Sequence, residues 1–418
     1  MQSSPTYPGP APQDEFRYPL YSPEFAANPH SWYEHMRATG QSLVPVELAP
    51  GVPAMLVIRH KTAVRILNDP QHFPSDPREW QGTVPQDSPV LAMMGYLPAA
   101  RYSIGLEHAR YRGASAFSID GVNVNGLMPM IENIAVTLIN TFCERGRADL
   151  MGDYAFKLVL EVLNRICGCP EDIGKKVADG MTKRFDQDRA LAKEGMLELK
   201  QALMELIQLK RDKPGDDATT RLVQHSSGLD DTEVWAQLMS FYGAGFELQR
   251  NLIVNTLLMM LTDPRYKDNS GRNLATMTAI DEVLFNDPPM ANFCTTYPRQ
   301  PTSLGDDGWV PAHQPVVISL AACNNDPEIR DAIHEGPGGA HSGNRSHLAW
   351  SIGPHACPAK PLAYHVTQYA IDEVLNALPD MEVMQPPDKL LWRPGPFTRG
   401  LVTLPVGFAP VPPMIVPA

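Results

Sequence analysis

The stretch LAWSIGPHACPAKPLAYHVTQYAIDEVL, residues 348–375, contains the most informative residue of the chain, Cys357. Cys357 ends a loop of small and aromatic residues, and Pro358 follows at the position where proline best begins a helix. Unpaired backbone N–H groups and the helix dipole lower the pKa of a thiol at such a place. A zinc site needs more ligands nearby than His355, and no partner motif of a cysteine protease is present. The residues alone leave a functional thiolate and a buried structural cysteine open.

The same stretch resembles the haem-binding loop of the cytochrome P450 superfamily, Phe-Gly-x-Gly-x-His-x-Cys-x-Gly followed by Leu-Ala-Arg. Gly353 and His355 match this pattern, and Trp350 stands at the Phe position. The resemblance implies that the Cys357 thiolate is the axial ligand of the iron of haem b, and that Trp350, Gly353, His355 and Ala359 border the cofactor. Leu362 and Ala363 also match, whereas Ser351, Ala359 and Tyr364 depart from the commonest residues.

Further segments in the same order extend the resemblance from about residue 16 to 410. They are FPSDP at 73–77, EHARYR at 107–112, YGAGFELQRNLI at 242–253, AACNNDP at 321–327 and FTRGLVTLPVGF at 397–408. The family fold is mainly α with small β-sheets, a triangular helical prism around a buried haem. We expect that fold here, as a single domain over residues 16–418 preceded by a flexible proline-rich arm at 1–15.

The carboxylates of a haem need paired donors when they are buried. The resemblance assigns this role to His108, Arg112 and His355. Arg299 is the fourth candidate: an ungapped alignment places the family's strand arginine at Tyr297, and residues two apart in a strand share a face. The alternative for each is a solvated surface cation.

Residues 231–262 have the pattern of one long helix, capped by Asp230 or Asp231 and stopped by Asp263-Pro264. Ser240, Gly243, Ala244, Glu247 and Leu248 share a face of it at helical spacing. A local opening of the helix at 243–245 would leave room for dioxygen, although glycine there also suits close helix packing. The resemblance implies catalytic roles for Ala244, Gly245, Glu247 and Leu248, with Glu247 as the proton-relay acid.

Two positions break the family pattern. The threonine that usually follows the acid is Leu248, and the neighbouring Gln249 is the available substitute. The Glu-x-x-Arg pair reads Glu282-x-x-Phe285, so Glu282 loses its usual partner. An unpaired buried carboxylate costs roughly 3–5 kcal/mol. We therefore expect Glu282 to be neutral, solvated or paired elsewhere, with Arg345 as the predicted partner.

Helical patterns also cover 128–145, 190–210, 276–285 and 361–377, with short strands near 54–60, 315–320 and 399–408. The formal charge of −12 argues against binding nucleic acid or an anionic membrane surface. The first residues contain no apolar stretch of a secretory signal, and six cysteines are too few for a disulfide framework, so we expect a cytoplasmic protein.

The implied function is a haem-thiolate monooxygenase that inserts one oxygen atom of O₂ into an apolar small molecule, with electrons from a ferredoxin and its reductase. The alternatives are a haem protein of the same fold with a binding or regulatory role, and a peroxide-using or oxidative-coupling enzyme. We expect an apolar, methionine-rich substrate pocket. Its predicted lining is Leu91, Met93, Met94, Ser240, Gly243, Met290, Phe293 and Phe397.

Overall fold

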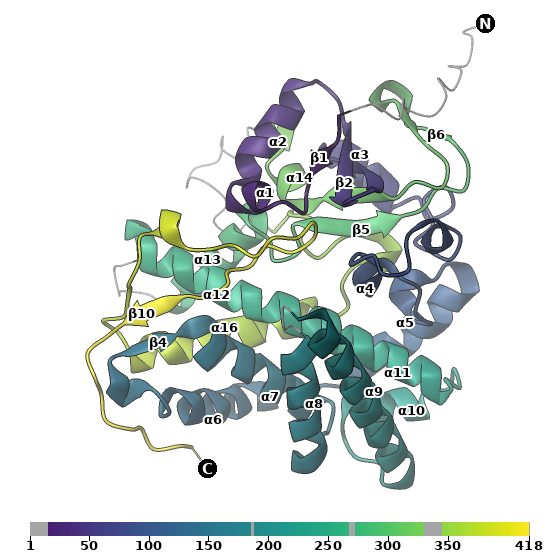
Figure 1. Ribbon diagram of the computed structural model, residues 1–418. Coiled ribbons are helices and arrows are strands. Elements are labelled where there is room, and N and C mark those ends of the chain that lie inside the picture. Colours follow the sequence, from purple (N-terminus) through teal and green to yellow (C-terminus); the bar gives the residue numbers. More distant parts are fainter. Residues whose placement is uncertain (1–15, 185–187, 267–271, 330–344, 418) are drawn as a thin grey trace, which may run out of the picture.

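The computed structural model describes residues 16–184, 188–266, 272–329 and 345–417. Helices make up most of these parts, with small sheets beside them (Figure 1), as the sequence predicts. The predicted arm at 1–15 and most of the glycine-rich loop at 335–347 lie outside the described residues. The single domain over 16–418 stays a prediction.

The α-helices contain the segments predicted to be helical, with ends shifted by a few residues. They are α1 (Pro23–Ala27), α2 (Pro29–Ala38), α3 (His60–Leu67), α4 (Leu91–Met94), α5 (Gly105–Asp120), α6 (Leu127–Ile139), α7 (Phe156–Ile166), α8 (Glu171–Arg184), α9 (Arg189–Asp212), α10 (Ala218–Gln224), α11 (Asp231–Ser240), α12 (Glu247–Thr262), α13 (Arg272–Asn286), α14 (Leu320–Asn324) and α16 (Lys360–Ala377).

The predicted long helix crosses the middle of the molecule as α11, a π-helical segment η6 (Phe241–Phe246) and α12 (Figure 1). Asp230 caps it, because its side chain accepts from the N–H of Glu233 while the Glu233 carboxylate accepts from the N–H of Asp230. A π-helical turn is wider than an α-turn and is frequent at functional sites. The predicted opening at 243–245 is therefore present as η6.

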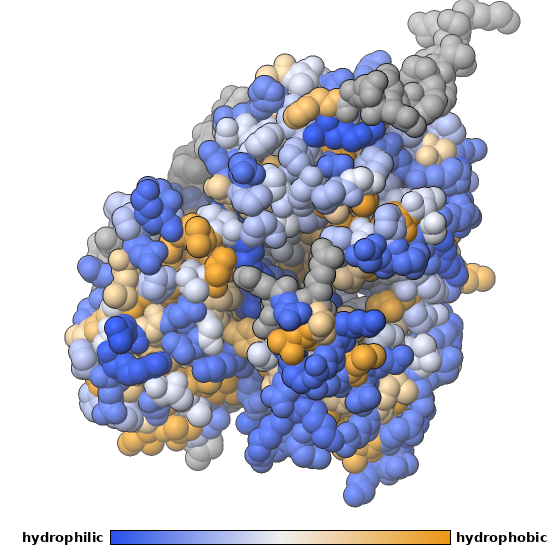
Figure 2. Space-filling view, viewed as in Figure 1, coloured by the Kyte–Doolittle hydropathy of each residue, from blue (hydrophilic) through white to orange (hydrophobic). Residues whose placement is uncertain are grey.

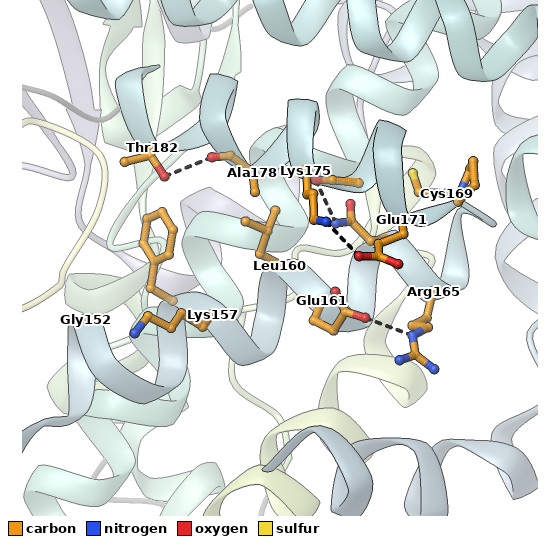
Figure 3. A pocket seen from close by; sticks show the side chains of 14 residues that line it. Gly152, Lys157, Leu160, Glu161, Arg165, Cys169, Glu171, Lys175, Ala178 and Thr182 are labelled. Atoms are coloured by element: carbon orange, nitrogen blue, oxygen red, sulfur yellow. Dashed lines mark hydrogen bonds and ion pairs between the residues drawn. The ribbon is translucent and has the colours of Figure 1, made fainter. Parts of the chain in front are cut away.

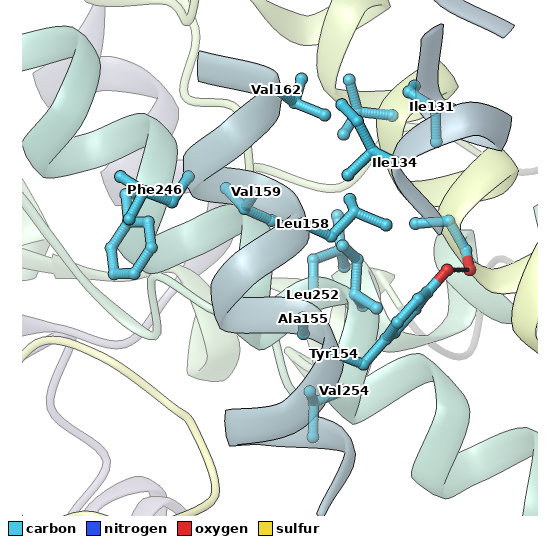
Figure 4. Packing of buried hydrophobic residues seen from close by; sticks show 14 of the residues in the cluster. Ile131, Ile134, Tyr154, Ala155, Leu158, Val159, Val162, Phe246, Leu252 and Val254 are labelled. Atoms are coloured by element: carbon cyan, nitrogen blue, oxygen red, sulfur yellow. Dashed lines mark hydrogen bonds between the residues drawn. The ribbon is translucent and has the colours of Figure 1, made fainter. Parts of the chain in front are cut away.

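Apolar residues of α6, α7 and α12, the last part of the central helix, pack together in one core cluster (Figure 4). Ile131, Leu158 and Val254 have no more than traces of exposed surface. The hydroxyl of Tyr154 donates to the Ala370 carbonyl at 2.6 Å and links the π-helical η5 (Leu150–Ala155) to α16. One described stretch, 124–145, is long and apolar enough to cross a membrane, but it contains α6, whose apolar face belongs to this core.

The largest sheet in the described residues has the strand order β1-β2-β3-β8-β5. Its strands are β1 (Tyr18–Pro19), β2 (Leu43–Ala49), β3 (Val52–Val57), β5 (Asn292–Thr296) and β8 (Val316–Ser319). The register of β5 against β8 shifts between Phe293 and Thr296, and Cys294 between them has a φ of +48°. This bulge re-aims the side chains of β5, as bulges near functional sites do.

The smaller sheets lie at the margins of the fold. One has the order β4-β10-β9 and the other pairs β6 with β7. Their strands are β4 (Arg147–Asp149), β6 (Thr302–Ser303), β7 (Trp309–Val310), β9 (Glu382–Val383) and β10 (Pro405–Gly407). The predicted strand at 399–408 is thus ordered as a strand only near its end.

Ion pairs connect α8 to α9 on the outside of the fold. Lys183 binds Glu194 at 2.6 Å and Glu198 at 2.5 Å, and Lys176 binds Glu205 at 2.6 Å. Hydrophilic residues cover much of this lower part of the molecule (Figure 2). These pairs are solvent-exposed, so each contributes little to stability.

The C-terminal segment runs along α6 and is bound there by two asparagine side chains. Asn140 donates to the carbonyl of Met414 and accepts from its N–H, both at 2.8 Å. Asn133 donates to the carbonyl of Pro417 at 2.8 Å. The segment packs on the body, although Ile415 is 94% exposed.

A buried polar cluster joins α13, α16 and the segment that leads to the cysteine loop. The hydroxyl of Tyr364 donates to Asp281 Oδ1 at 2.6 Å, and Arg345 Nε donates to Asp281 Oδ2 at 3.2 Å. His347 Nε2 lies 3.3 Å from the Tyr364 hydroxyl, and Phe285 packs edge-on against the His347 ring. Burial and the Asp281 carboxylate raise the pKa of Tyr364, which therefore stays a hydrogen-bond donor. Two of the departures from the family pattern, Phe285 and Tyr364, thus belong to one cluster.

The predicted pairing of Glu282 with Arg345 is wrong. Glu282 Oε1 instead accepts from Arg265 Nη2 at 2.8 Å, and Oε2 accepts from the hydroxyl of Tyr266. Both partners stand in the 3₁₀ turn η7 (Pro264–Tyr266) directly after α12. Asp281 and Glu282 are successive residues of α13, so their side chains point in different directions. Arg345 therefore binds Asp281, whereas Glu282 faces Arg265.

Replacing Tyr364 by Phe should lower the free energy of unfolding by about 1–3 kcal/mol, since it removes a donor from a carboxylate that is nearly inaccessible to water. The measurement is the denaturant midpoint of the full chain. Tyr369→Phe on the same helix is the matched control: its ring stacks on His365, and a change below about 0.5 kcal/mol is expected. Equal midpoints for both variants would show that the Tyr364 hydroxyl contributes nothing.

Candidate functional site

The loop that carries Cys357 is shaped by backbone contacts. Gly353 has a φ of +71°, and a Cβ there would lie 2.3 Å from the carbonyl oxygen of Leu67, so only glycine fits. The N–H of Cys357 donates to the Trp350 carbonyl at 2.8 Å. After the 3₁₀ turn η9 (Gly353–His355), α16 begins at Lys360, and Pro361 rather than Pro358 occupies its first turn. The helix start therefore lies later than predicted.

The Cys357 thiol lines a cavity of about 370 Å³, a size typical of ligand sites. Burial raises its pKa, whereas the N–H of Ala359 and the charges of Arg112 and Lys360 act to lower it. Burial is the larger effect, so the expectation of a lowered pKa is wrong for the protein alone. A metal ion on the sulfur would supply the missing positive charge, because a coordinated thiol is deprotonated.

Three basic side chains gather at one part of the cavity wall. His108 and Arg112 project from successive turns of α5, and His355 comes from the cysteine loop. The rings of His108 and His355 are 4.4 Å apart. Burial and the nearby positive charges of His108 and Arg112 lower the pKa of His355 to about 4. Burial, followed by Arg112, also lowers the pKa of His108.

None of these three side chains has a carboxylate partner among the described residues. The Nε2 atom of His108 is buried and has no hydrogen-bond partner there. Arg110 on the same helix, by contrast, is bound by Glu233, whose pKa it lowers to about 2. Arg110 thus fastens α5 to α11, and the guanidinium of Arg112 with the imidazoles of His108 and His355 stays available as donors to an anionic group.

The central helix forms another wall of the cavity. Its lining residues recur at a spacing of three to four: they are Gln237, Ser240, Phe241, Ala244, Gly245, Leu248, Gln249 and Leu252. Gly245 lies against Leu163 of α7, where a Cβ would make a contact of 3.4 Å. Gly243 does not line the cavity and has no neighbour within 4 Å of an added Cβ, so its predicted place in the pocket is wrong.

Glu247 points away from the cavity. Its carboxylate accepts from Arg250 Nη2 at 2.5 Å, Arg393 Nη2 at 2.6 Å and Asn251 Nδ2 at 3.1 Å. Burial opposes ionisation, but the two guanidinium groups outweigh it and hold the pKa of Glu247 below its ordinary value. A relay through Glu247 would have to release a carboxylate bound by two arginines. Its role as proton-relay acid stays a prediction.

Gln249 does not replace the missing threonine. Its amide donates to the Ala363 carbonyl at 3.0 Å and to the hydroxyl of Thr367. Both acceptors belong to α16, so the side chain of Gln249 connects two helices instead of presenting a free polar group.

Arg299 is not part of the cavity, contrary to the prediction. It is half exposed, and its guanidinium lies 3.6 Å from Asp76 and 3.5 Å from Glu79. The alternation of faces along β5 ends with the strand at Thr296, so it does not extend to residue 299. Tyr297 is buried against Trp80.

Arg101, which the sequence analysis missed, lines the cavity from the 3₁₀ turn η2 (Ala100–Tyr102).

The other predicted site residues divide into two groups. Trp350, Ala359, Ser240, Met290 and Phe293 line the cavity, whereas Gly353 shapes the loop from behind. The predicted places of Leu91, Met93, Met94 and Phe397 in the lining are wrong. These four pack in an apolar cluster with the strands of the large sheet, and Phe397 reaches the cavity only through its contact with Phe293.

The residues of the cavity fit a haem. The lining is mostly apolar, a thiol is available for the iron, and the unpartnered cations suit two propionates. Among the described residues, no cluster of three or more His, Cys, Asp or Glu side chains offers a competing metal site.

A second hollow lies between α7 and α8 (Figure 3). Its rim has ion pairs between Glu161 and Arg165 and between Glu171 and Lys175, at 2.8 and 2.7 Å. These charges already satisfy one another, and the hollow is open to solvent, so it has no feature that selects a ligand.

Curated relatives cover nearly the whole chain, although no family model matches it. The cytochrome P450 monooxygenase PikC of Streptomyces venezuelae is 28% identical, over 92% of each chain. The vitamin D(3) 25-hydroxylase of Pseudonocardia autotrophica is 25% identical, over 94% of this chain and 97% of its own.

Solved structures agree with the fold. CYP154C4 from Streptomyces sp. W2061 superposes with a TM-score of 0.82 at 24% identity, over 94% of this chain and 98% of its own. The tirandamycin C-bound monooxygenase TamI gives 0.77 at 25%, over 94% and 100%. Together with the cysteine loop and the cavity above it, these likenesses establish that the chain belongs to the cytochrome P450 superfamily, in its bacterial type.

Proposed function

We propose that the protein is a haem-thiolate monooxygenase that inserts one oxygen atom of O₂ into an apolar small molecule, with electrons from a ferredoxin and its reductase. The observation that carries the proposal is the Cys357 thiol in an apolar cavity whose wall holds His108, Arg112 and His355 without acidic partners. The curated relatives PikC and the vitamin D(3) hydroxylase are named as oxygenating enzymes, which supports the same reaction class.

In this proposal each residue has a limited task. Cys357 ligates the iron of haem b, and the thiolate-ligated haem supplies the oxidising power. His108, Arg112 and His355 bind the propionates. Ala244 and Gly245 leave space beside the widened helix, and the apolar lining excludes water from the substrate, which contacts Met290 and Phe293.

The cavity wall offers no free side chain that could deliver protons to dioxygen among the residues considered for this role. Leu248 has no hydroxyl to hold a water, Gln249 is engaged by α16, and Glu247 is bound by Arg250 and Arg393. This favours a second candidate, a peroxide-using enzyme, because peroxide brings its own protons. A haem protein of the same fold with a binding or regulatory role remains the third candidate.

Replacing Cys357 by Ser should abolish the red-shifted absorption of the ferrous carbon monoxide complex, since a serine oxygen does not reproduce thiolate ligation. The readout is the difference spectrum of the reduced protein with carbon monoxide. Cys294→Ser is the matched control, because Cys294 lines the same cavity and should leave the band in place. Retention of the band in Cys357→Ser would disprove ligation of the iron by Cys357.

Replacing Arg112 by Ala should lower haem occupancy after purification, because a buried propionate that loses its donor costs about 1–3 kcal/mol. The double variant with His108→Ala should lose more. Arg299→Ala serves as control and should keep normal occupancy, since Arg299 lies outside the cavity. The measurement is the haem-to-protein absorbance ratio. Full occupancy in the double variant contradicts the pairing.

Replacing Leu248 by Thr should raise the product formed per reductant consumed, since positioned proton transfer contributes about 10²–10⁴ in rate. Leu248→Val, which has the shape of threonine without its hydroxyl, is the control. The unaltered protein should work relatively better with added peroxide than with reductase and O₂. Tight coupling of the unaltered protein on a substrate without hydroxyl groups would contradict the proton defect.

A further inference from the structure

Arg101 is a cation in the cavity wall without an acidic partner. Its Nη2 atom donates to the Met93 carbonyl at 3.3 Å, which is a long bond, and its Nε is buried with no hydrogen-bond partner. The guanidinium lies over the ring of Phe293 at 4.0 Å and over that of Tyr102 at 5.2 Å. No ion pair connects it to an acid within the described parts of the chain.

Two arginines that are more deeply buried than Arg101 are neutralised. Arg250 binds Glu247, and Arg399 binds Asp287 at 3.1 Å. A guanidinium held against aromatic rings without a counter-charge is costly, and the planar, five-donor group suits a carboxylate that it can bind with two parallel bonds. The aromatic contacts fix the orientation of the group, so its donors are already aligned for such an anion.

Arg101 belongs to a different part of the wall from the three cations assigned to the cofactor. The charge of Arg112 lowers the pKa of His108 and of His355, which places these three groups close together. The positive charge of Arg101 instead acts on Cys294 and Tyr297, on and beside β5, and on Arg184 at the end of α8. Its direct neighbours are Met93 of α4 and Phe293 of that strand, and Phe293 lines the side of the cavity proposed for substrate.

We propose that Arg101 binds the carboxylate of the substrate, so that the protein acts on an organic acid with an apolar body. The inference rests on the proposed function for the identity of the site, and it narrows the substrate class from apolar molecules to amphipathic acids. The acid group would be held at Arg101 while the apolar body extends along Met290 and the face of Ala244 and Leu248.

The test compares matched acids and neutral analogues on the haem-loaded protein. Dodecanoate against 1-dodecanol, and 2-naphthoate against 2-naphthamide, are titrated by the change they cause in the haem absorption spectrum. The unaltered protein should bind each acid more tightly than its neutral analogue. Arg101→Gln should weaken acid binding roughly 10- to 100-fold, as expected for a charged hydrogen bond, and should change the affinity for the neutral analogues by less than about twofold.

Lys389→Ala is the charge-matched control, since it removes one exposed cation outside the cavity and should leave all four affinities unchanged. Arg101→Lys should restore part of the preference for acids. The inference is overturned if the unaltered protein shows no preference for either acid, or if Arg101→Gln weakens acids and neutral analogues equally, which would make Arg101 a packing residue.

Measuring haem occupancy shows whether Arg101 binds a substrate carboxylate or a propionate of the haem. Arg101→Gln should purify with normal occupancy, and a loss like that of Arg112→Ala would assign Arg101 to the cofactor and overturn the inference. If the protein takes up no haem at all, the proposed function fails. Calorimetric titration of the same acids into the haem-free chain still decides whether Arg101 selects a carboxylate.

Discussion

Holding a thiol at the wall of an apolar cavity is the constraint on which the rest of this structure depends. Burial makes an isolated thiolate unfavourable, so the loop must fix the sulfur with backbone contacts rather than with charges on its own side chains. Gly353 lets the loop pass within contact of the Leu67 carbonyl, and the N–H of Cys357 is bound by Trp350. The following helix, α16, is bound to α13 by the hydrogen bond from the Tyr364 hydroxyl to Asp281.

The charged side chains of the protein interior and those of the cavity wall are paired differently. The acids of the interior are matched with arginines: Glu247 with Arg250 and Arg393, and Glu282 with Arg265. The cavity wall has the opposite imbalance, since it holds Arg101 and Arg112 and none of the described residues that line it is an acid. Such an imbalance is unfavourable in the empty protein, so an anionic occupant stabilises the fold as it binds.

Much of the site was predictable because local spacing decides it. Cys357 and His355 come from one loop, and His108 and Arg112 are four residues apart on one helix. The wrong predictions concern residues at which the regular spacing of a helix or strand is interrupted. Strand alternation ends before Arg299, and the π-helical segment changes the phase of the central helix, so that Gly243 and Glu247 leave the face they would share in an unbroken α-helix. Arg101 stands in the short 3₁₀ turn η2, which is too short to show a periodicity, and only the fold brings it to the cavity.

The binding of the C-terminal segment to α6 depends on two lengths that match. Asn133 and Asn140 are seven residues apart, which is about 10.5 Å along a helix. The carbonyls of Met414 and Pro417 are three residues apart, or roughly 9–10 Å in an extended chain. The two asparagines can therefore bind the segment only when the spacing of its carbonyls equals their own spacing along α6. One residue inserted between positions 414 and 417 would break the match, whereas residues appended beyond the end of the chain would leave it intact.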